Sequence, residues 1–300
     1  MAKGRLNNPG LAYIYASLAV VFWSTAASAF KLTLEHIDFI SILFVATFTS
    51  CVALFMVLWI QGKVSLLRLT TRNELFRSAL LGVLNPFLYY TILLKAYSIL
   101  PAQVAQPLNF TWPIMLVILS APLLKQKITY TSIGAMVISF TGVYLISSQG
   151  SPFSPGFANP LGVSLALFSS VLWALFWIFN IRDHRNEVVK LFLSFTFAFL
   201  YVAIVMIFAW QPDSLNLHGI AGGVYIGLFE MGFTFVFWLK ALQYAVSTDK
   251  VSNMIYITPF FSLLLISVLV GEQIYITTFG GLILIVGGIV LQKFLTPAYR

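Results

Sequence analysis

Residues 92–113, ILLKAYSILPAQVAQPLNFTWP, decide the fold, because residues 237–259, FWLKALQYAVSTDKVSNMIYITP, follow the same plan. The Leu-Lys-Ala of residues 94–96 returns at residues 239–241, and Pro113 returns as Pro259. The correspondence extends over residues 81–145 and 226–291, at offsets of 145 and then 146 residues. A repeat of this length predicts a duplicated structure whose two copies pack around a shared interface.

The composition places the chain in a lipid bilayer. Of its 300 residues 60% are hydrophobic and only 9% are charged, and the mean hydropathy is +0.94. A soluble domain has about 25% charged residues. The net charge of +8 does not indicate a nucleic-acid partner here, because the basic residues lie between apolar runs and are typical of topology signals. A single cysteine, Cys51, excludes an internal disulfide.

Ten apolar runs are long enough to cross a bilayer, which takes about 20 helical residues. The expected spans are 11–34, 38–60, 76–97, 101–123, 130–148, 160–181, 189–210, 219–243, 249–270 and 276–295. The sequence therefore predicts an all-α polytopic membrane protein with five helices in each repeat. The first run follows Lys3 and Arg5 as in a secretory signal, but its length favours an uncleaved helix.

Lysine and arginine mark the side of the membrane on which each loop lies. Fifteen of the seventeen fall on one side of the ten spans, and only Lys31 and Lys95 fall on the other. Because positive residues gather in cytoplasmic loops, both termini should be cytoplasmic. Five spans per repeat is an odd number, so the second copy should be inverted relative to the first and enclose a central cavity. The expected parts are a cytoplasmic N-terminus (1–10), a first repeat (11–148), an external linker (149–159), a second repeat (160–296) and a cytoplasmic C-terminus (297–300).

Polar and aromatic side chains inside the spans are candidates for lining that cavity, because polar groups at membrane depth face the protein interior or water. They recur at helical spacing in both repeats. The candidate residues are Trp23, Ser28, Asn85, Tyr89, Gln106, Asn109, Trp173, Trp177, Asn180, Glu230, Thr234, Phe237, Asn253 and Tyr256. The alternative is that small polar residues serve only helix packing.

Glu230 stands out in this set as the acidic residue that lies well inside a span. A carboxylate at the bilayer centre costs at least about 2.5 kcal/mol on insertion scales. Glu230 could bind a substrate ammonium or take up a proton during transport. A structural hydrogen bond to a neighbouring helix is the competing interpretation.

Prolines interrupt the same spans. Pro113 and Pro259 lie at equivalent positions, and Pro86 and Pro107 add further interruptions, so we expect kinks that could act as hinges. The glycines 280, 281, 287 and 288 of the last span favour close helix packing. No metal-ligand spacing, nucleotide-binding loop or nucleophile motif occurs in the sequence. We therefore expect no metal, no cofactor and no enzymatic activity.

With its early tryptophans (Trp23, Trp173), its Leu-Lys-Ala motifs and a proline in the fourth helix of each half, the chain resembles the paired EamA repeats of the drug/metabolite transporter superfamily. Gly271-Glu272, followed by Gly280 and Gly288, adds to the likeness. The first repeat departs from it with Lys125-Gln126-Lys127 at the equivalent place. Within the superfamily the chain looks most like YddG-type aromatic amino-acid exporters. The resemblance implies alternating access in a bacterial inner membrane.

The absence of Lys and Arg near any span centre argues against a phosphorylated cargo. Asn, Tyr, Trp and Glu suit a zwitterionic or weakly charged solute with an aromatic or apolar body. We expect an exporter of amino acids, aromatic or other large neutral ones. A multidrug or cationic-compound efflux transporter is the alternative within the superfamily, and an intramembrane enzyme using Glu230 is the alternative from another class. The expected partners are a small-molecule substrate and the lipid bilayer, and a monomer is one state that the sequence leaves open.

Overall fold

The computed structural model describes residues 8–125, 128–153, 158–209, 216–246 and 248–295. Throughout these ranges the regular structure is helical and contains no strand. Ten helical stretches are long and apolar enough to cross a membrane, which confirms the all-α polytopic class and the expected number of spans in the described residues. These stretches are Pro9–Leu34, Phe39–Ile60, Arg72–Ile99, Ala102–Leu123, Tyr130–Ser147, Pro160–Asn180, Glu187–Ala209, Leu217–Tyr244, Lys250–Val270 and Ile276–Lys293.

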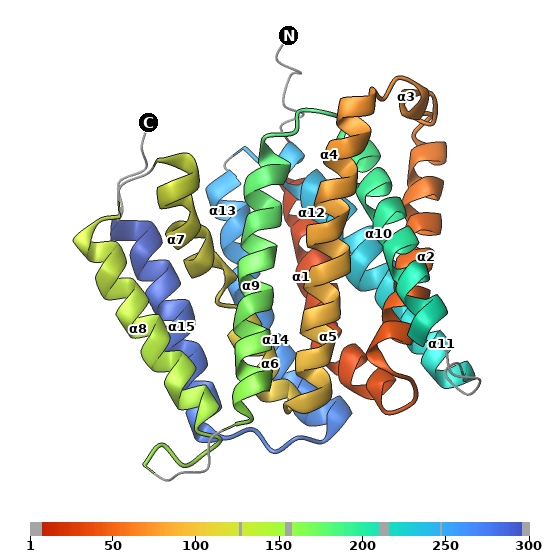
Figure 1. The fold of residues 1–300 in the computed structure, drawn as a ribbon. Coiled ribbons are helices and arrows are strands. Elements are labelled where there is room, and N and C mark those ends of the chain that lie inside the picture. The colour runs from red at the N-terminus through yellow and green to blue at the C-terminus, as the bar shows by residue number, and fades with distance from the viewer. Residues whose placement is uncertain (1–7, 126–127, 154–157, 210–215, 247, 296–300) are drawn as a thin grey trace. The chain divides into compact units, whose positions relative to one another are not determined.

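The helices fall into two compact units, each of which takes helices from both sequence repeats. Unit 1 comprises Met1–Phe87 and Asp183–Leu265, and unit 2 comprises Leu88–Arg182 and Ile266–Arg300. The helices of unit 1 are α1 (Pro9–Leu34), α2 (Phe39–Ile60), α3 (Ser65–Arg68), α4 (Arg72–Gly82), α10 (Glu187–Ala209), α11 (Leu217–Tyr225), η2 (Ile226–Gly232), α12 (Phe233–Tyr244), α13 (Thr248–Ser252), η3 (Asn253–Ile257) and α14 (Thr258–Leu265). The last residue of η1 (Val83–Leu88) is the first of unit 2, and the rest of η1 belongs to unit 1. The helices of unit 2 are α5 (Tyr89–Ile99), α6 (Ala102–Asn109), α7 (Trp112–Leu124), α8 (Tyr130–Ser147), α9 (Pro160–Ile181), η4 (Ile266–Val270) and α15 (Ile276–Leu295) (Figure 1).

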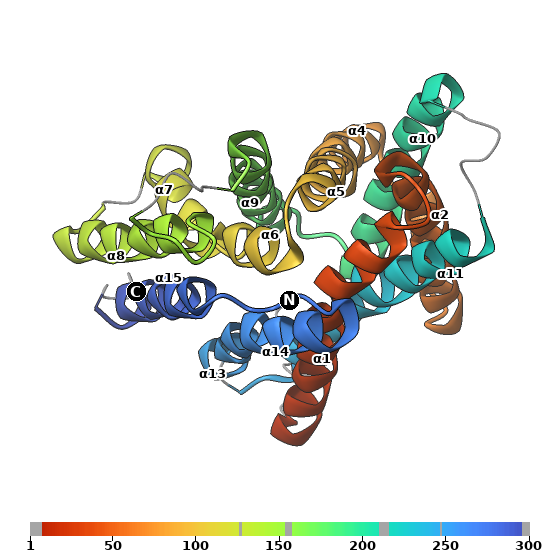
Figure 2. The ribbon, with the colours of Figure 1, turned by 90° about the horizontal axis from the view of Figure 1, so that it is seen from below.

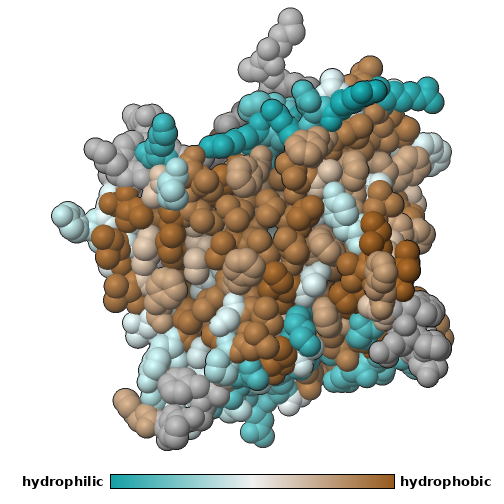
Figure 3. All heavy atoms as spheres, in the orientation of Figure 1, coloured by the Kyte–Doolittle hydropathy of each residue, from teal (hydrophilic) through white to brown (hydrophobic). Residues whose placement is uncertain are grey.

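Polar side chains in the connections decide where the spans begin. The first amides of a helix lack partners within it, and a side-chain oxygen just before the helix can accept their hydrogen bonds. Asn8 caps α1 in this way, and Asp38 caps α2 through the amides of Ile40 and Ser41. In the view of Figure 3, hydrophobic residues cover the sides of the helices and hydrophilic residues gather near helix ends.

In unit 2, α8 and α15 lie side by side (Figure 1, Figure 2). Their backbones meet at glycine: a Cβ added to Gly142 would lie 2.4 Å from the carbonyl oxygen of Gly281, and a Cβ on Gly288 would overlap α8. The packing role expected for the last span is therefore confirmed for Gly281 and Gly288. It is wrong for Gly280 and Gly287, where an added Cβ would meet nothing within 4 Å.

We expect Gly142→Val to destabilise unit 2, because the facing backbone of α15 cannot move aside as a flexible side chain could. Overpacking of a tight contact costs about 1–3 kcal/mol. Gly134→Val on the same helix is the matched control, since Gly134 has open space where its Cβ would be. The unfolding temperature of each variant in detergent measures the effect. Equal temperatures for the two variants would contradict a close contact at Gly142.

Gly271 has a conformational role rather than a packing role. Gly271 has a φ of 77°, in the left-handed region, and the equivalent residue of the first repeat, Lys125, has a φ of 56°. Glycine adopts this region without the steric cost that a side chain adds. The two repeats therefore share a left-handed residue at the end of equivalent helices, although only the second uses glycine. Glu272 follows this turn directly.

The connection between the sixth and seventh spans forms an ionic cluster in unit 1. Asp183 accepts hydrogen bonds from Arg185, whose guanidinium also donates to Ser78 Oγ at 2.9 Å, so that the connection is joined to α4. Lys190 Nζ lies 2.6 Å from Glu187 and donates to the carbonyl of Asp183. Burial acts to raise the pKa of the Asp183 carboxyl, but the hydrogen bonds and charge of Arg185, with the charge of Lys190, outweigh it and hold that pKa below its ordinary value.

Candidate functional site

The third and eighth spans are irregular at equivalent positions. In η1 two helices meet at a kink where Asn85 has non-helical torsions (φ −151°, ψ 124°), and the π-helical segment η2 contains Glu230, which lies 145 residues further along the chain. Single π-turns inside membrane helices are frequent at functional sites, because they redirect side chains and alter backbone pairing. The sequence repeat therefore extends to a local irregularity that places Asn85 and Glu230 at corresponding points.

The fourth and ninth spans are also interrupted at corresponding points. The break between α6 and α7 follows Asn109, and the 3-10 segment η3 begins at Asn253 and leads into α14. Pro113 and Pro259 are the second residues of α7 and α14. Each span is therefore interrupted next to its proline, which lies where the new helix starts and needs no amide partner there.

The other two prolines differ from each other. Pro107 lies within α6, whereas Pro86 lies in η1 directly after Asn85, at the kink where two helices meet. Whether any of the four prolines acts as a hinge stays a prediction.

In unit 2 a chain of hydrogen bonds joins three helices. Tyr89 Oη donates to Asn109 Oδ1 at 3.2 Å, Asn109 Nδ2 donates to Ser169 Oγ at 2.8 Å, and Ser169 Oγ donates to the carbonyl of Ala166 at 2.6 Å. Tyr89 and Asn109 belong to the first sequence repeat and Ser169 to the second. The structure thus brings polar residues of both repeats together within one unit.

Aromatic rings adjoin this chain. The rings of Tyr89 and Trp173 lie 4.7 Å apart with a tilt of 37°, and Trp173 meets Trp177 edge to face at 6.0 Å. Trp173 is buried, whereas Trp177 and Asn109 are half-buried. We call Tyr89, Asn109, Ser169, Trp173 and Trp177 the amide–aromatic cluster. It combines ring faces with an amide that can both donate and accept hydrogen bonds.

Two other predicted residues of unit 2 lie on the same helices as the cluster. Gln106 is on α6 and half-buried, and its Oε1 has no hydrogen-bond partner among the described residues. Asn180 is buried near the end of α9 and has a partner.

The predicted residues of unit 1 include three buried polar side chains. Glu230 is 7% exposed in η2, which packs on α1 and α2. Asn85 is fully buried, and neither atom of its amide group has a hydrogen-bond partner in the part of the chain that the structure describes. The hydroxyl of Ser28 on α1 is also buried and also has no hydrogen-bond partner among the described residues.

Aromatic residues of both repeats also meet in unit 1. Trp23 lies 5.6 Å from Trp238 and meets Phe235 edge to face at 6.0 Å, while Phe237 stacks on Tyr15. Trp238 and Phe235 were absent from the predicted set, although Trp238 follows Thr234 by one helical turn and that spacing was a usable signal.

The remaining predicted residues of unit 1 are Thr234, Asn253 and Tyr256. Thr234 is buried and its hydroxyl donates to the carbonyl of Phe229, which is the structural use of threonine in a helix. Asn253 and Tyr256 are half-buried in η3.

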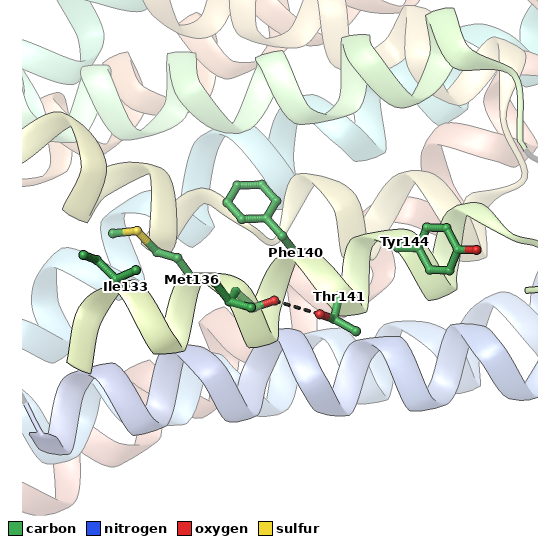
Figure 4. A pocket seen from close by; sticks show the side chains of 6 residues that line it. Ile133, Met136, Phe140, Thr141 and Tyr144 are labelled. Carbon is green, nitrogen blue, oxygen red and sulfur yellow. Dashed lines mark hydrogen bonds between the residues drawn. The ribbon is translucent and has the colours of Figure 1, made fainter. Parts of the chain in front are cut away.

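A groove on the surface of unit 2 lies away from all predicted residues. It runs along α8 alone and is lined by Ile133, Met136, Val137, Phe140, Thr141 and Tyr144 (Figure 4). Thr141 Oγ1 donates a hydrogen bond to the carbonyl oxygen of Val137, on the same helix, at 2.9 Å. These side chains are mostly exposed and apolar, as suits a helix face in contact with lipid rather than a site for a polar substrate.

Two histidines meet at helix ends in unit 1. The rings of His36, just after α1, and His218, at the start of α11, stack 5.2 Å apart, a proximity that their separation in sequence concealed. Among the residues placed by the structure, no three His, Cys, Asp or Glu side chains come together as metal ligands.

Ten apolar helices in two repeats, interrupted at matching points beside polar and aromatic residues, define a multi-pass membrane protein of the transporter class. The chain belongs to the EamA-like transporter family, whose model matches residues 10–148 and 160–292.

Curated relatives agree with this assignment. An uncharacterized transporter of Archaeoglobus fulgidus is 26% identical over 87% of this chain and 91% of its own length. An uncharacterized transporter of Clostridium kluyveri is 24% identical over 93% and 92% of the two chains, and YvbV of Bacillus subtilis, also an uncharacterized transporter, is 23% identical over 73% and 72%. A protein of known crystal structure is 21% identical in sequence, and its structure superposes on this one with a TM-score of 0.65 over 95% of this chain and 96% of the other. This similarity shows a shared fold.

Proposed function

We propose that this transporter exports amino acids, aromatic or other large neutral ones, by alternating access through the cavity that the sequence predicts between its repeats. The observation that carries this proposal is the amide–aromatic cluster of unit 2. A substrate zwitterion with an aromatic body needs a flat apolar surface and hydrogen-bonding groups beside it, and the cluster has both.

The hydrogen-bonding capacity of Asn109 supports the proposal. An asparagine amide has two N–H donors and an oxygen with two lone pairs. Tyr89 occupies one lone pair, and Ser169 receives one donor. One donor and one lone pair are therefore left on a half-buried group, and the donor suits a substrate carboxylate.

Charge supports a zwitterion over an anion. Glu230 in η2 is a buried acidic side chain that suits an ammonium group or a transported proton. The lysines of the spans lie toward helix ends: Lys95 is exposed near the end of α5, and Lys240 Nζ lies 5.2 Å from the centre of the Tyr15 ring. An organic cation would use the same carboxylate and tryptophans, so cation efflux is the second candidate.

The membrane and the orientation belong to the proposal as well. We propose a bacterial inner membrane with both termini in the cytoplasm, on the strength of the fifteen-to-two distribution of Lys and Arg. A transporter rather than an enzyme is proposed because the chain belongs to a transporter family, and because the sequence offers no candidate for the second acid or base that catalysis by Glu230 would normally need.

Counterflow in proteoliposomes tests the proposal. Vesicles loaded with unlabelled phenylalanine should accumulate labelled phenylalanine in excess of protein-free vesicles, and leucine should compete. Exchange of labelled organic cations without exchange of any amino acid would overturn amino-acid export in favour of cation efflux.

A further inference from the structure

Glu272 lies just after the left-handed Gly271 and caps a helix of the other sequence repeat. Its Oε1 accepts a hydrogen bond from the amide of Ala102 at 2.6 Å, and its Oε2 accepts one from the amide of Gln103 at 3.0 Å. These are the first two amides of α6, and Pro101 before them offers no side-chain cap. A carboxylate is the favoured group at such a helix start, since it satisfies free amides and opposes the positive end of the helix dipole.

The side chain of Gln103 in turn forms hydrogen bonds with residues at the start of α15 and just before it. Its Oε1 accepts from the amide of Tyr275 at 2.9 Å and from the hydroxyl of Thr278 at 3.3 Å, and its Nε2 donates to the carbonyl of Gln273 at 2.8 Å. Tyr275 directly precedes α15, so the side chain of each helix start satisfies the backbone of the other. All of these atoms belong to unit 2.

The capped helix ends at the amide–aromatic cluster. α6 contains eight residues, Ala102–Asn109, and so spans about 12 Å. A helix this short does not hold itself in place. Glu272 and Gln103 fix its first turn, and its last residue is Asn109, whose amide bonds Tyr89 and Ser169.

We propose that Glu272 is a positioning residue for the substrate: through α6, its carboxylate holds the Asn109 amide where it can bind an amino-acid carboxylate. This inference rests on the proposed function.

The test is counterflow of phenylalanine by Glu272→Gln, which replaces one accepting oxygen by a donor that cannot bond an amide N–H. We expect the KM to rise roughly tenfold, as for the loss of one hydrogen bond to a charged group, with the maximal rate changed less than twofold. Glu272→Asp, which keeps the charge, should restore most of the affinity. The matched control is Glu74→Gln, because Glu74 closes the capping box of α4 with Thr71 and lies outside unit 2. It should leave the KM unchanged.

A double-mutant cycle shows whether Glu272 acts through Asn109. In an Asn109→Ala background, Glu272→Gln should add less than a twofold change in KM, since the group that it positions is gone. Full additivity of the two substitutions would overturn the proposal. So would an unchanged KM in Glu272→Gln with a lower yield of folded protein, which is the behaviour of a structural cap alone.

Hydrogen exchange separates this inference from the function on which it rests. Amides of residues 102–109 should exchange several-fold faster in Glu272→Gln than in the parent or in Glu74→Gln. Faster exchange in a protein that transports no amino acid would leave the Glu272–α6 link standing and refute the substrate. Unchanged exchange would refute the link whatever the substrate.

Discussion

Glu230→Gln reduces amino-acid exchange at least tenfold and removes the pH dependence of the residual rate; this is the largest effect that we expect from one substitution. Glu230 is 7% exposed inside a membrane span, in a π-helical turn that packs on α1 and α2. A carboxylate costs at least about 2.5 kcal/mol at that depth. Contact with a substrate ammonium, or with a proton that moves during the cycle, accounts for an acidic group there.

The substitution keeps the size of the side chain and a hydrogen-bond acceptor, and it removes the negative charge. A structural hydrogen bond would therefore survive it, whereas a charge interaction would not. Glu35→Gln is the matched control, because Glu35 is exposed at the end of α1 and makes the same change of charge. The measurement is counterflow in proteoliposomes across a range of pH at equal protein content. An unchanged rate and pH profile in Glu230→Gln would assign Glu230 to structure.

The number and type of the helices could be predicted because hydropathy alone selects them. The ends were less predictable: the third span was expected from residue 76 and begins at Arg72. Thr71 and Glu74 form a capping box that starts α4 in polar surroundings. The Thr-x-x-Glu spacing was a usable signal that hydropathy does not register.

The candidate site was predictable residue by residue but not contact by contact. Helical spacing placed Tyr89, Asn109, Trp173 and Trp177 on polar or aromatic faces, and the structure joins them. The capping of α6 by Glu272 crosses 170 residues of sequence and leaves no local pattern. The kink at Asn85 has a local signal in Pro86, which follows it, whereas the π-helical turn at Glu230 has none.

The compact units could not be predicted from the repeat. Each repeat is contiguous in sequence, but α1 of the first repeat packs on α12 and α14 of the second, and α5 packs on α9. Helices bury their faces against whichever neighbour matches them in shape. In a duplicated membrane protein, that neighbour often belongs to the other copy.

Asn85→Leu should separate stability from transport. The Asn85 amide is fully buried, and neither of its polar atoms bonds any described residue. A buried amide without partners costs about 1–3 kcal/mol, and leucine of similar size removes that cost without breaking a protein hydrogen bond. The extended torsions of Asn85 are open to leucine. We therefore expect the unfolding temperature in detergent to rise by about 2 °C or more, while phenylalanine exchange falls roughly tenfold because the amide is lost to the substrate.

Asn109→Leu is the matched control, since it makes the same chemical change at an asparagine that bonds Tyr89 and Ser169. Its loss of two hydrogen bonds should lower the unfolding temperature, so the two variants should move stability in opposite directions while both reduce exchange. A drop in unfolding temperature for Asn85→Leu as large as that for Asn109→Leu would make Asn85 a structural residue. A more stable protein with undiminished exchange would remove it from the substrate path. A gain in stability together with a loss of transport is the result expected for a substrate-binding polar group. Such a group lowers the stability of the free protein while it is buried without hydrogen bonds, and it forms those bonds only when the substrate is bound.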